Sequence, residues 1–554
     1  MSDSETTSPP NRQGDGNTSA PETLHALVPE DGLGSVPIDD GKPLLELLKI
    51  AGPSVATMSS YTLMQFVDTF MVKQIGPETE YVAAQGNGGI IAWMFVALAL
   101  GTNTVINSFV SQNLGAGTPQ RGSAYAWNGM WLAVVYYVAI MVPAAILAPY
   151  FVPGAHSPFL QELEVGYAKI LLYGAIVTVA SRSIHHYFYG LHRPGIVLIS
   201  AIAGNLVNVL VNAVLIFGED GMPLPESPFG QALFAPIAGV AKPIASFLGI
   251  EAMELRGAAI GTVVGGFVEF VIPFGLFLSG KFAREYGTRA AWKPRKAIMG
   301  DILRVGWPGG MMMLNELICW GLLMAWLVPV GAQAMARADG ASPEEIEHAG
   351  TIANTAGWIA LRYMHLSFMP TVGISIGAQA MVGKAMGMGR PDLAHARAML
   401  ALKLALGYMG ACAVLFVLKR SELIGVFINS ATPREDIESI VRVGSLVMIA
   451  AAVFQLFDAV AIVLSGALRG AGDTVWPGVA TIVLSWSCIV GVGLLLIQFV
   501  PGLGSLGPWI GAAGYIVALG IALGVRYWLG AWRQMTLVRP DSGVGPADGA
   551  GENT

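Results

Sequence analysis

Scarcity of charge constrains this 554-residue chain more than any other feature. Asp, Glu, Lys and Arg make up 12% of its residues, whereas hydrophobic residues make up 54%. Water-soluble domains carry about 25% charged residues, so this chain has too few charges to cover a water-soluble fold of its size. A bilayer requires no such cover, because helices satisfy their own backbone polar groups. The composition predicts an all-α protein that crosses a membrane many times.

Twelve apolar segments are long enough to cross the roughly 30 Å of hydrocarbon in a bilayer. Gly and Pro are frequent inside them, which membrane helices tolerate better than soluble ones. The first six segments are 48–75, 84–113, 124–150, 165–190, 195–217 and 257–279. The second six are 301–330, 351–383, 394–417, 438–465, 475–500 and 509–532. We predict that each forms one transmembrane helix.

The segments fall into two sets of six, separated by a basic stretch. We expect an N-terminal lobe over 43–280, a cytoplasmic linker over 281–300 and a C-terminal lobe over 301–535. The polar, Gly- and Pro-containing tails, 1–42 and 536–554, lack an apolar stretch long enough to form a core. We therefore predict that both tails are disordered.

The connection between the fifth and sixth segments, residues 218–256, is unusually long. Its middle, from Phe229 to Ile250, is apolar but interrupted by Pro236 and Pro243. We interpret this part as an interfacial or lid-like segment. A thirteenth span is disfavoured, because it would invert the orientation of everything that follows it.

Loop charge predicts the orientation of the chain. The connection between the sixth and seventh segments carries six Lys or Arg residues against one acid, Glu285. The positive-inside rule then places this connection and both termini in the cytoplasm of a cell that has the protein in its inner membrane. The connection between the ninth and tenth segments is an exception, because it lies on the predicted outer side and carries Lys419, Arg420 and Arg434.

An internal repeat relates the two halves. The run GTNTVINSFVSQNLGAG from Gly101 aligns with GISIGAQAMVGKAMGMG from Gly373, at an offset of 272 residues. The run from Gly190 to Arg193 aligns with the run from Gly466 to Arg469, at an offset of 276. Matching segments lie six apart, so the repeats are parallel. Two such halves enclose a cavity near the midplane and can rock against each other, as alternating access requires.

Several runs resemble the multidrug and toxic compound extrusion (MATE) family. The run FQLFDAVAIVLSGALRGAGD, from Phe454 to Asp473, resembles the helix 10 signature of that family. VDTFMV, SQNLGAG, GWPGG and FMPTVGISIGAQAMVGKAMG follow the family's order within about residues 44–535. The resemblance implies twelve transmembrane helices in two parallel six-helix repeats. An acid in helix 7 together with an Asp in helix 10 resembles the NorM-type branch in particular.

Two acids lie inside spans of the C-terminal half. A carboxylate at the bilayer centre costs at least about 2.5–3.5 kcal/mol, so each needs an explanation. Neither Asp458 nor Glu316 has a Lys or Arg within four residues. If they meet across the bundle, the pair can exchange a proton or Na⁺ for a cationic substrate. The resemblance matches both to the family's cation-site acids, which makes them candidate Na⁺ ligands. A structural hydrogen bond is the alternative.

The N-terminal half offers one acid and three amides. Asp68 matches the acid that the family uses in this half, and Asn205, Asn208 and Asn212 share one helical face. Asn208 and Asn212 can accept from a protonated Asp68 or coordinate Na⁺; interhelical hydrogen bonding is the alternative. Some relatives carry a carboxylate in place of Asn212, so a two-carboxylate proton site is less expected here. Three other ionisable residues within spans have no assigned role: Glu269, Arg362 and His365.

These features favour a secondary antiporter for multidrug efflux, which exports small organic cations in exchange for Na⁺ or H⁺. ATP-driven pumping is disfavoured because there is no GxxxxGK[ST] motif. We expect no cofactor, a monomer in the lipid bilayer, and no nucleic-acid partner, since the net charge is −6. The alternative is a flippase for a lipid-linked sugar or other amphiphile of the same superfamily. An enzyme ranks third, because no HExxH or GxSxG motif occurs in a plausible context.

Overall fold

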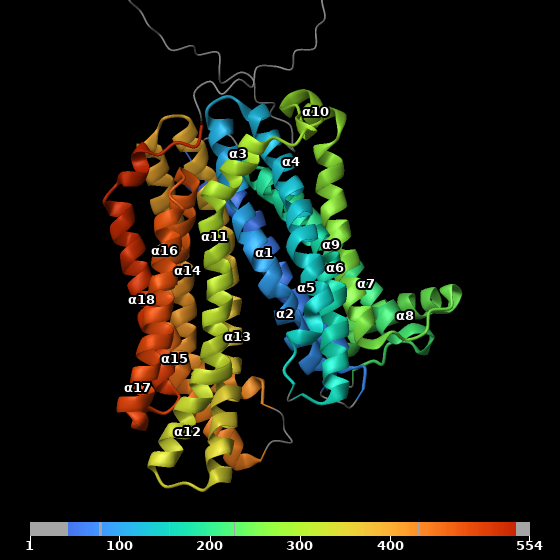
Figure 1. Cartoon of the computed structure of the whole chain (residues 1–554), viewed down its shortest axis with the longest axis vertical. Helices are drawn as coiled ribbons and strands as arrows, with labels where there is room; N and C mark the ends of the chain where they lie inside the picture. Colours follow the sequence, from blue (N-terminus) through green and yellow to red (C-terminus); the bar gives the residue numbers. More distant parts are fainter. Residues whose placement is uncertain (1–41, 77–79, 155, 226–227, 429–432, 539–554) are drawn as a thin grey trace, which may run out of the picture. The chain divides into compact units, whose positions relative to one another are not determined.

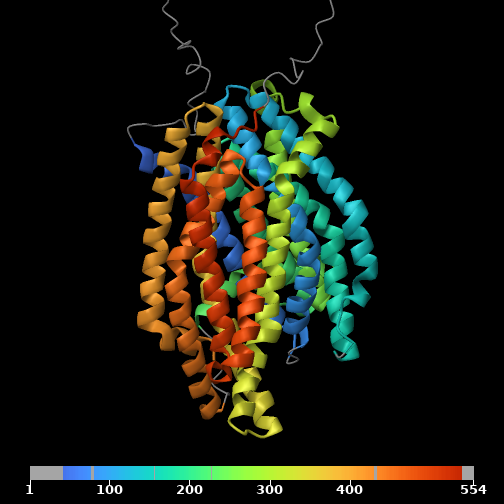
Figure 2. The same ribbon diagram turned by 60° about the vertical axis from the view of Figure 1, so that its left-hand side comes forward.

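The computed structural model describes residues 42–76, 80–154, 156–225, 228–428 and 433–538. Within this part of the chain every regular element is helical and no strand occurs, as the composition predicts (Figure 1). Long helices of both halves run side by side (Figure 2). The predicted tails fall almost entirely outside the described residues.

The N-terminal half contains six spans built from helices or helical runs. They are α1 (Pro43–Lys73), α2 with α3 (Glu80–Asn103, Val105–Gly115), α4 with α5 (Pro119–Tyr136, Val142–Leu147), α6 (Pro158–Gly190), α7 (Pro194–Phe217) and α9 (Glu254–Phe277). A short helix, α10 (Gly280–Tyr286), follows. Each predicted segment of this half coincides with one of these six spans to within a few residues at most ends.

The C-terminal half repeats this arrangement. Its spans are α11 with α12 (Lys296–Leu322, Val328–Ala338), α13 (Pro343–Gly387), α14 (Pro391–Val426), α15 (Arg434–Ala471), α16 with α17 (Val475–Leu484, Gly493–Phe499) and α18 (Leu506–Trp528). Eleven of the twelve runs are long and apolar enough to cross a membrane. The remaining one, α1, is long enough with 31 residues but lacks an equally apolar stretch. Twelve membrane helices in two repeats are therefore consistent with the structure.

Local sequence signals explain where the helices begin and end. Proline opens α1, α4, α6, α7 and α13, where its missing N–H would have no helical partner. Ser342 and Glu345 form a capping box at the start of α13, with each side chain accepting from the other's backbone N–H. Gly117 and Gly389, which the repeat aligns, both adopt a positive φ just beyond α3 and α13.

The connection between α7 and α9 contains a further helix, α8 (Pro228–Leu248), with Pro236 and Pro243 inside it. It packs against α7 and extends sideways from the bundle in Figure 1. Its apolar stretch, Phe234–Leu248, is shorter than a membrane span. Within the described residues, the connection therefore adds no thirteenth span.

Glycines that the repeat aligns bring the two halves into backbone contact. A side-chain carbon on Gly101 of α2 would collide with the backbone of Gly309 in α11, and one on Gly373 of α13 would collide with Val55 in α1. The contacts correspond, because α2 meets α11 as α13 meets α1. Small residues permit this close approach of membrane helices. The two close contacts between the lobes therefore lie at glycine positions that the repeat relates.

We predict that Gly373→Ala destabilises the protein, whereas Gly407→Ala in α14 does not. The added methyl group at Gly373 meets the Val55 backbone, but nothing lies within 4 Å of the corresponding position at Gly407. Overpacking of this kind costs about 1–3 kcal/mol. Thermal unfolding of the purified variants in detergent tests this. A Gly373→Ala variant as stable as Gly407→Ala would contradict the proposed close contact.

Candidate functional site

Glu316 and Asp458 lie together inside the C-terminal lobe. Glu316 is in α11 and Asp458 is in α15, and the two interact electrostatically with each other. Tyr515 of α18 donates a hydrogen bond to Glu316 Oε1 at 3.3 Å and also lies within electrostatic range of Asp458. Asp458 has no hydrogen-bond partner among the described residues. A purely structural hydrogen bond therefore does not account for Asp458 in this structure.

Arg469 supplies the positive charge of this C-terminal cluster. It interacts electrostatically with Glu316 from the last turn of α15, and its buried Nε has no hydrogen-bond partner among the described residues. Two ionised carboxylates and one guanidinium leave a net charge of −1. One monovalent cation or one proton neutralises the cluster. The sequence marked Arg469 only as part of the repeat, because its distance of eleven residues from Asp458 gives no local signal.

The carboxylates and the phenol of the C-terminal cluster fit a hard monovalent cation. Their oxygen atoms are the ligands that such ions prefer. The amide of neighbouring Asn315 is occupied, since it donates to Ser485 Oγ at 2.8 Å and accepts from Trp486 Nε1 at 2.8 Å. No group of three His, Cys, Asp or Glu side chains that could hold a metal ion occurs in the described part of the chain. The two acids and Tyr515 would hold Na⁺ if it binds here.

Asp68 is held by amides in the N-terminal lobe. Asn212 Nδ2 lies 2.7 Å from Asp68 Oδ1 and 3.0 Å from Asn208 Oδ1, so it donates toward both. Asn205 does not join them, because its amide donates to the backbone oxygen of Ser60 at 3.3 Å. Two of the three predicted asparagines therefore lie with Asp68. An amide that donates to a carboxylate matches its ionised form.

Glu269 belongs to a second polar cluster in the same lobe. Tyr61 of α1 donates a hydrogen bond to Glu269 Oε1, and His185 Nδ1 of α6 lies 3.7 Å from the same oxygen. The guanidinium of Arg182 lies 5.4 Å from the centre of the Tyr61 ring and interacts electrostatically with Glu269. Tyr61 precedes Asp68 by seven residues, so this cluster lies about two helical turns nearer the start of α1.

The second cluster occupies the repeat-related position of the C-terminal cluster. Arg182 and Asp458 differ by 276, the offset that aligns Gly190 with Gly466. Tyr61 lies eight residues after Pro53 in α1, as Glu316 lies eight after Pro308 in α11. The Glu269 cluster thus has the guanidinium of Arg182 where the C-terminal cluster has the carboxylate of Asp458. The offset of the repeat relates these positions in the sequence. The local pattern around each residue does not show that they correspond.

Close packing of α7 on α9 positions both N-terminal clusters. Side-chain carbons added at Gly261 and Gly265 of α9 would collide with Asn212 and Asn208, and one added at Gly204 of α7 would approach Glu269. Each polar side chain therefore faces a glycine on the opposite helix. Arg362 and His365 of α13 lie elsewhere: Arg362 is 5.6 Å from the Phe427 ring centre and pairs with no acid among the described residues.

Hydrogen bonds between described residues join the lobes at one end of the bundle. Asn107 Nδ2 donates to Ile376 O at 3.3 Å, and Gln379 Nε2 donates to Thr104 O at 3.0 Å. Donors and acceptors both differ by 272, so the two bonds are related by the repeat. All inter-lobe hydrogen bonds and ion pairs shown between described residues lie at this end, where α1 begins and α10 lies (Figure 1).

A buried ion pair adds to these contacts. Arg397 Nη2 of α14 lies 2.8 Å from Glu46 Oε2 of α1, and the two residues are only 5% and 3% exposed. Lys384 of α13 is also within electrostatic range of Glu46. Removing one partner of a buried pair leaves an uncompensated charge. This pair therefore favours the closed arrangement of this end.

We predict that Glu269→Gln destabilises the N-terminal lobe and that Arg182→Gln added to it restores part of the loss. The single change leaves the Arg182 charge without its acid, at a cost of about 1–3 kcal/mol. The double change removes both charges. Thermal unfolding of the single and double variants measures the coupling. Additive losses would contradict an interaction between the two residues.

Comparison with known proteins places the chain in a family. The family model described as MatE matches residues 53–214 and 346–494, more than half of the chain. A probable multidrug resistance protein NorM of Pseudomonas aeruginosa is 24% identical over 490 residues, covering 87% of this chain and 89% of the relative. A multidrug resistance protein NorM of Burkholderia vietnamiensis is 24% identical and covers 88% of this chain and 94% of the relative.

Solved structures share the fold of this chain. A MOP superfamily transporter from Pyrococcus furiosus aligns with a TM-score of 0.72 at 20% identity, over 89% of this chain and 97% of its own. A multidrug resistance MATE family transporter, described in an outward-facing conformation, aligns with a TM-score of 0.71 at 20% identity over the same shares. At these identities the likeness shows the fold. The names describe transporters and resistance proteins, not enzymes.

Proposed function

The chain belongs to the MatE family of transporters, and from this premise we propose that it is a secondary antiporter for small organic cations. The relatives that it resembles over most of its length are named multidrug resistance proteins. The observation that carries the proposal is the C-terminal cluster, in which Glu316, Asp458 and Arg469 leave one net negative charge. Such a site holds one cation at a time, so an inward-moving ion and an outgoing organic cation compete for it.

The coupling ion in this proposal is Na⁺ or H⁺, bound between Glu316 and Asp458. Either ion removes the net charge of the cluster and lowers the cost of keeping it away from water. Asp68, with Asn212 and Asn208, provides a second acid at which a proton or Na⁺ can act. Its amide partners make it a weaker candidate for coupling than the C-terminal cluster, where a second acid is present.

The one-sided contact between the lobes supports alternating access as the mechanism in this proposal. Close glycine contacts and buried polar contacts join the lobes at the end where α1 begins. Among the described residues, no inter-lobe hydrogen bond or ion pair is shown at the other end. Loop charge places the joined end in the cytoplasm of a cell with the protein in its inner membrane. In this proposal the structure is a state closed to the cytoplasm, and rocking of the lobes against each other opens it.

We predict that Asp458→Asn abolishes gradient-driven transport while the protein still folds. The change removes the acid that binds the ion but keeps the shape of the side chain. Purified protein in liposomes, with Na⁺ and pH gradients imposed independently, measures efflux of a fluorescent organic cation and shows which ion drives it. Asp339→Asn, on an exposed residue, is the control. Undiminished transport by Asp458→Asn would rule out its coupling role, and transport driven by neither gradient would rule out the antiporter.

We predict that Arg397→Gln loosens the joined end. The Glu46 carboxylate then loses the guanidinium that lies 2.8 Å from it, and a broken buried pair costs up to about 3–5 kcal/mol. Hydrogen exchange of the backbone amides of α3 is expected to accelerate, because α3 makes the neighbouring inter-lobe contacts. Arg434→Gln breaks a mostly exposed pair with Glu438 and serves as the control. Unchanged exchange in α3 would show that the ion pair does not hold the lobes together.

A flippase for a lipid-linked amphiphile is the alternative. A phosphate-bearing substrate calls for unpaired cations in the cavity, whereas Arg182 and Arg469 lie near acids. Arg362 has no acidic partner among the described residues, but it lies beside Phe427 at the end of α14. The same liposomes discriminate the two functions. Movement of a labelled phosphate-linked lipid between leaflets, without efflux of organic cations, would favour the flippase.

A further inference from the structure

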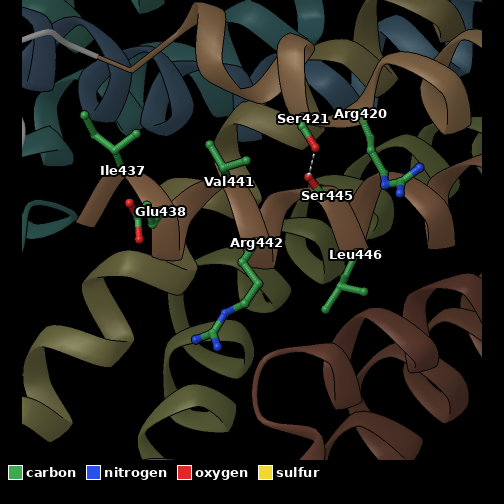
Figure 3. A pocket seen from close by; sticks show the side chains of 8 residues that line it. All are labelled: Arg420, Ser421, Ile437, Glu438, Val441, Arg442, Ser445 and Leu446. Carbon is green, nitrogen blue, oxygen red and sulfur yellow. Dashed lines mark hydrogen bonds between the residues drawn. The ribbon is translucent and has the colours of Figure 1, made fainter. Parts of the chain in front are cut away.

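A groove lies between α14 and α15 at the end of the bundle remote from the inter-lobe contacts. Its volume is about 470 Å³, and residues of both helices line it (Figure 3). Arg420 and Ser421 come from α14, and Arg442, Ser445 and Leu446 come from α15. This is the predicted outer connection that departs from the charge pattern of the other loops.

The backbone of α14 shapes this groove. Lys419 leaves helical geometry, with φ of −115° and ψ of 17°, so the last turns of α14 change direction beside α15. Ser421 Oγ lies 3.2 Å from Ser445 Oγ and joins the two helices (Figure 3). Ile424 packs on Gly444 just beyond this pair. A hydrogen bond between the two helices therefore forms part of the lining of the groove.

Two guanidinium groups at the groove have no acidic partner among the described residues. Lys419 pairs with Glu422 at 3.0 Å, and Arg434 pairs with Glu438 at 3.4 Å. Arg420 donates to the backbone oxygen of Val417 at 2.7 Å, and no ion pair of Arg420 or Arg442 occurs in the described part of the chain. Glu438 also lines the groove, but Arg434 compensates its charge. The groove therefore keeps an excess of positive charge.

An exposed apolar stripe continues from the groove along α15. Arg442 is followed at helical spacing by Leu446, Ile449, Val453 and Leu456, which share one face. Leu446 is 44% exposed and Val453 is 62% exposed. On α14, the neighbouring Leu418 is 71% exposed. A positively charged groove at one end of an exposed apolar stripe is complementary to the headgroup and acyl chain of an anionic lipid.

The stripe faces away from the contact between the lobes. Helix α13, which meets the N-terminal lobe, packs on another face of α15, where Gln455 donates to Ser367 at 2.7 Å and Gly466 contacts Ser375. Residue positions on a helix advance by about 100°, so Gln455 lies far around α15 from Val453. The exposed stripe thus points toward the bilayer.

We propose that this groove binds a phospholipid with a net negative headgroup. Arg420 and Arg442 hold the phosphate, since guanidinium groups match phosphate geometry with paired hydrogen bonds. The Ser421 and Ser445 hydroxyls are further donors, and the acyl chain lies along the stripe from Leu446 to Leu456. The proposal explains why this outer connection keeps basic residues, because anionic lipid compensates their charge. It does not depend on the transport function proposed above.

Native mass spectrometry of the purified protein with phosphatidylglycerol tests the proposal. Replacing both arginines (Arg420→Gln with Arg442→Gln) is expected to weaken binding about 30-fold, as two surface charges are lost. The control is Arg256→Gln with Arg533→Gln, which removes the same charge from two exposed residues that pair with acids and do not line the groove. Binding to the control protein is expected to stay close to wild type. Phosphatidylcholine with the same chains is expected to bind weakly to all three proteins.

Two further arms separate the lipid from soluble phosphate. Leu446→Ser with Val453→Ser keeps the charges but interrupts the apolar track, and it is expected to weaken phosphatidylglycerol binding as well. Displacement of the lipid by excess inorganic phosphate would show that the site recognises phosphate without the chains and would overturn the proposal. Wild-type lipid binding by the double-arginine variant, or equal loss in the control, would overturn it too. Melting temperatures of all variants confirm that each is folded.

Discussion

The structure depends on one constraint: an ionisable side chain inside a bilayer needs a partner. The acids within the spans meet it in different ways. Asp68 accepts from an amide, Glu269 has a phenol and a nearby guanidinium, and Glu316 has a phenol with a guanidinium at a distance. Asp458 has no hydrogen-bond or ion-pair partner among the described residues, and it interacts electrostatically with another acid and with the Tyr515 phenol. Asp458 is therefore the acid whose charge is balanced least by other side chains. A bound cation is expected to stabilise it more than the other three acids.

Close helix contacts keep these partners in place. Where α7 meets α9, glycines let polar side chains of one helix press against the backbone of the other. At the joined end, glycines do the same between lobes and leave backbone oxygens within reach of Asn107 and Gln379. The same small residues thus serve two purposes. They fix the acids inside each lobe, and they bring the lobes together at a surface that contains few bulky groups.

The sequence predicts the fold well because its signals are local. Apolar length, opening prolines and glycine-marked ends define the spans, and rare acids such as Glu316 and Asp458 stand out against an apolar background. Their proximity followed from the resemblance and not from spacing. Partners far apart in the chain escaped prediction: Glu46 with Arg397, and Tyr61 with Glu269. Only packing decides which distant residues meet, so no local pattern reports these pairs. Asn205 shows the converse, since a shared helix face did not bring it to Asp68.

The repeat explains why the two halves differ in chemistry despite sharing a framework. Three repeat-related helices in each half carry a polar cluster: Tyr61, Arg182 and Glu269 in one, and Glu316, Asp458 and Tyr515 in the other. Each set contains a phenol and a carboxylate, and the third member is a guanidinium in the first half but a carboxylate in the second. The guanidinium of Arg182 is a positive charge covalently fixed to the protein. It balances the charge of Glu269 in the N-terminal lobe, whereas the C-terminal cluster retains a net negative charge even with Arg469 nearby. Exchange of a cation is accordingly expected first in the second half, because of these two repeat-related clusters only the one in that half leaves a charge for a mobile ion to neutralise.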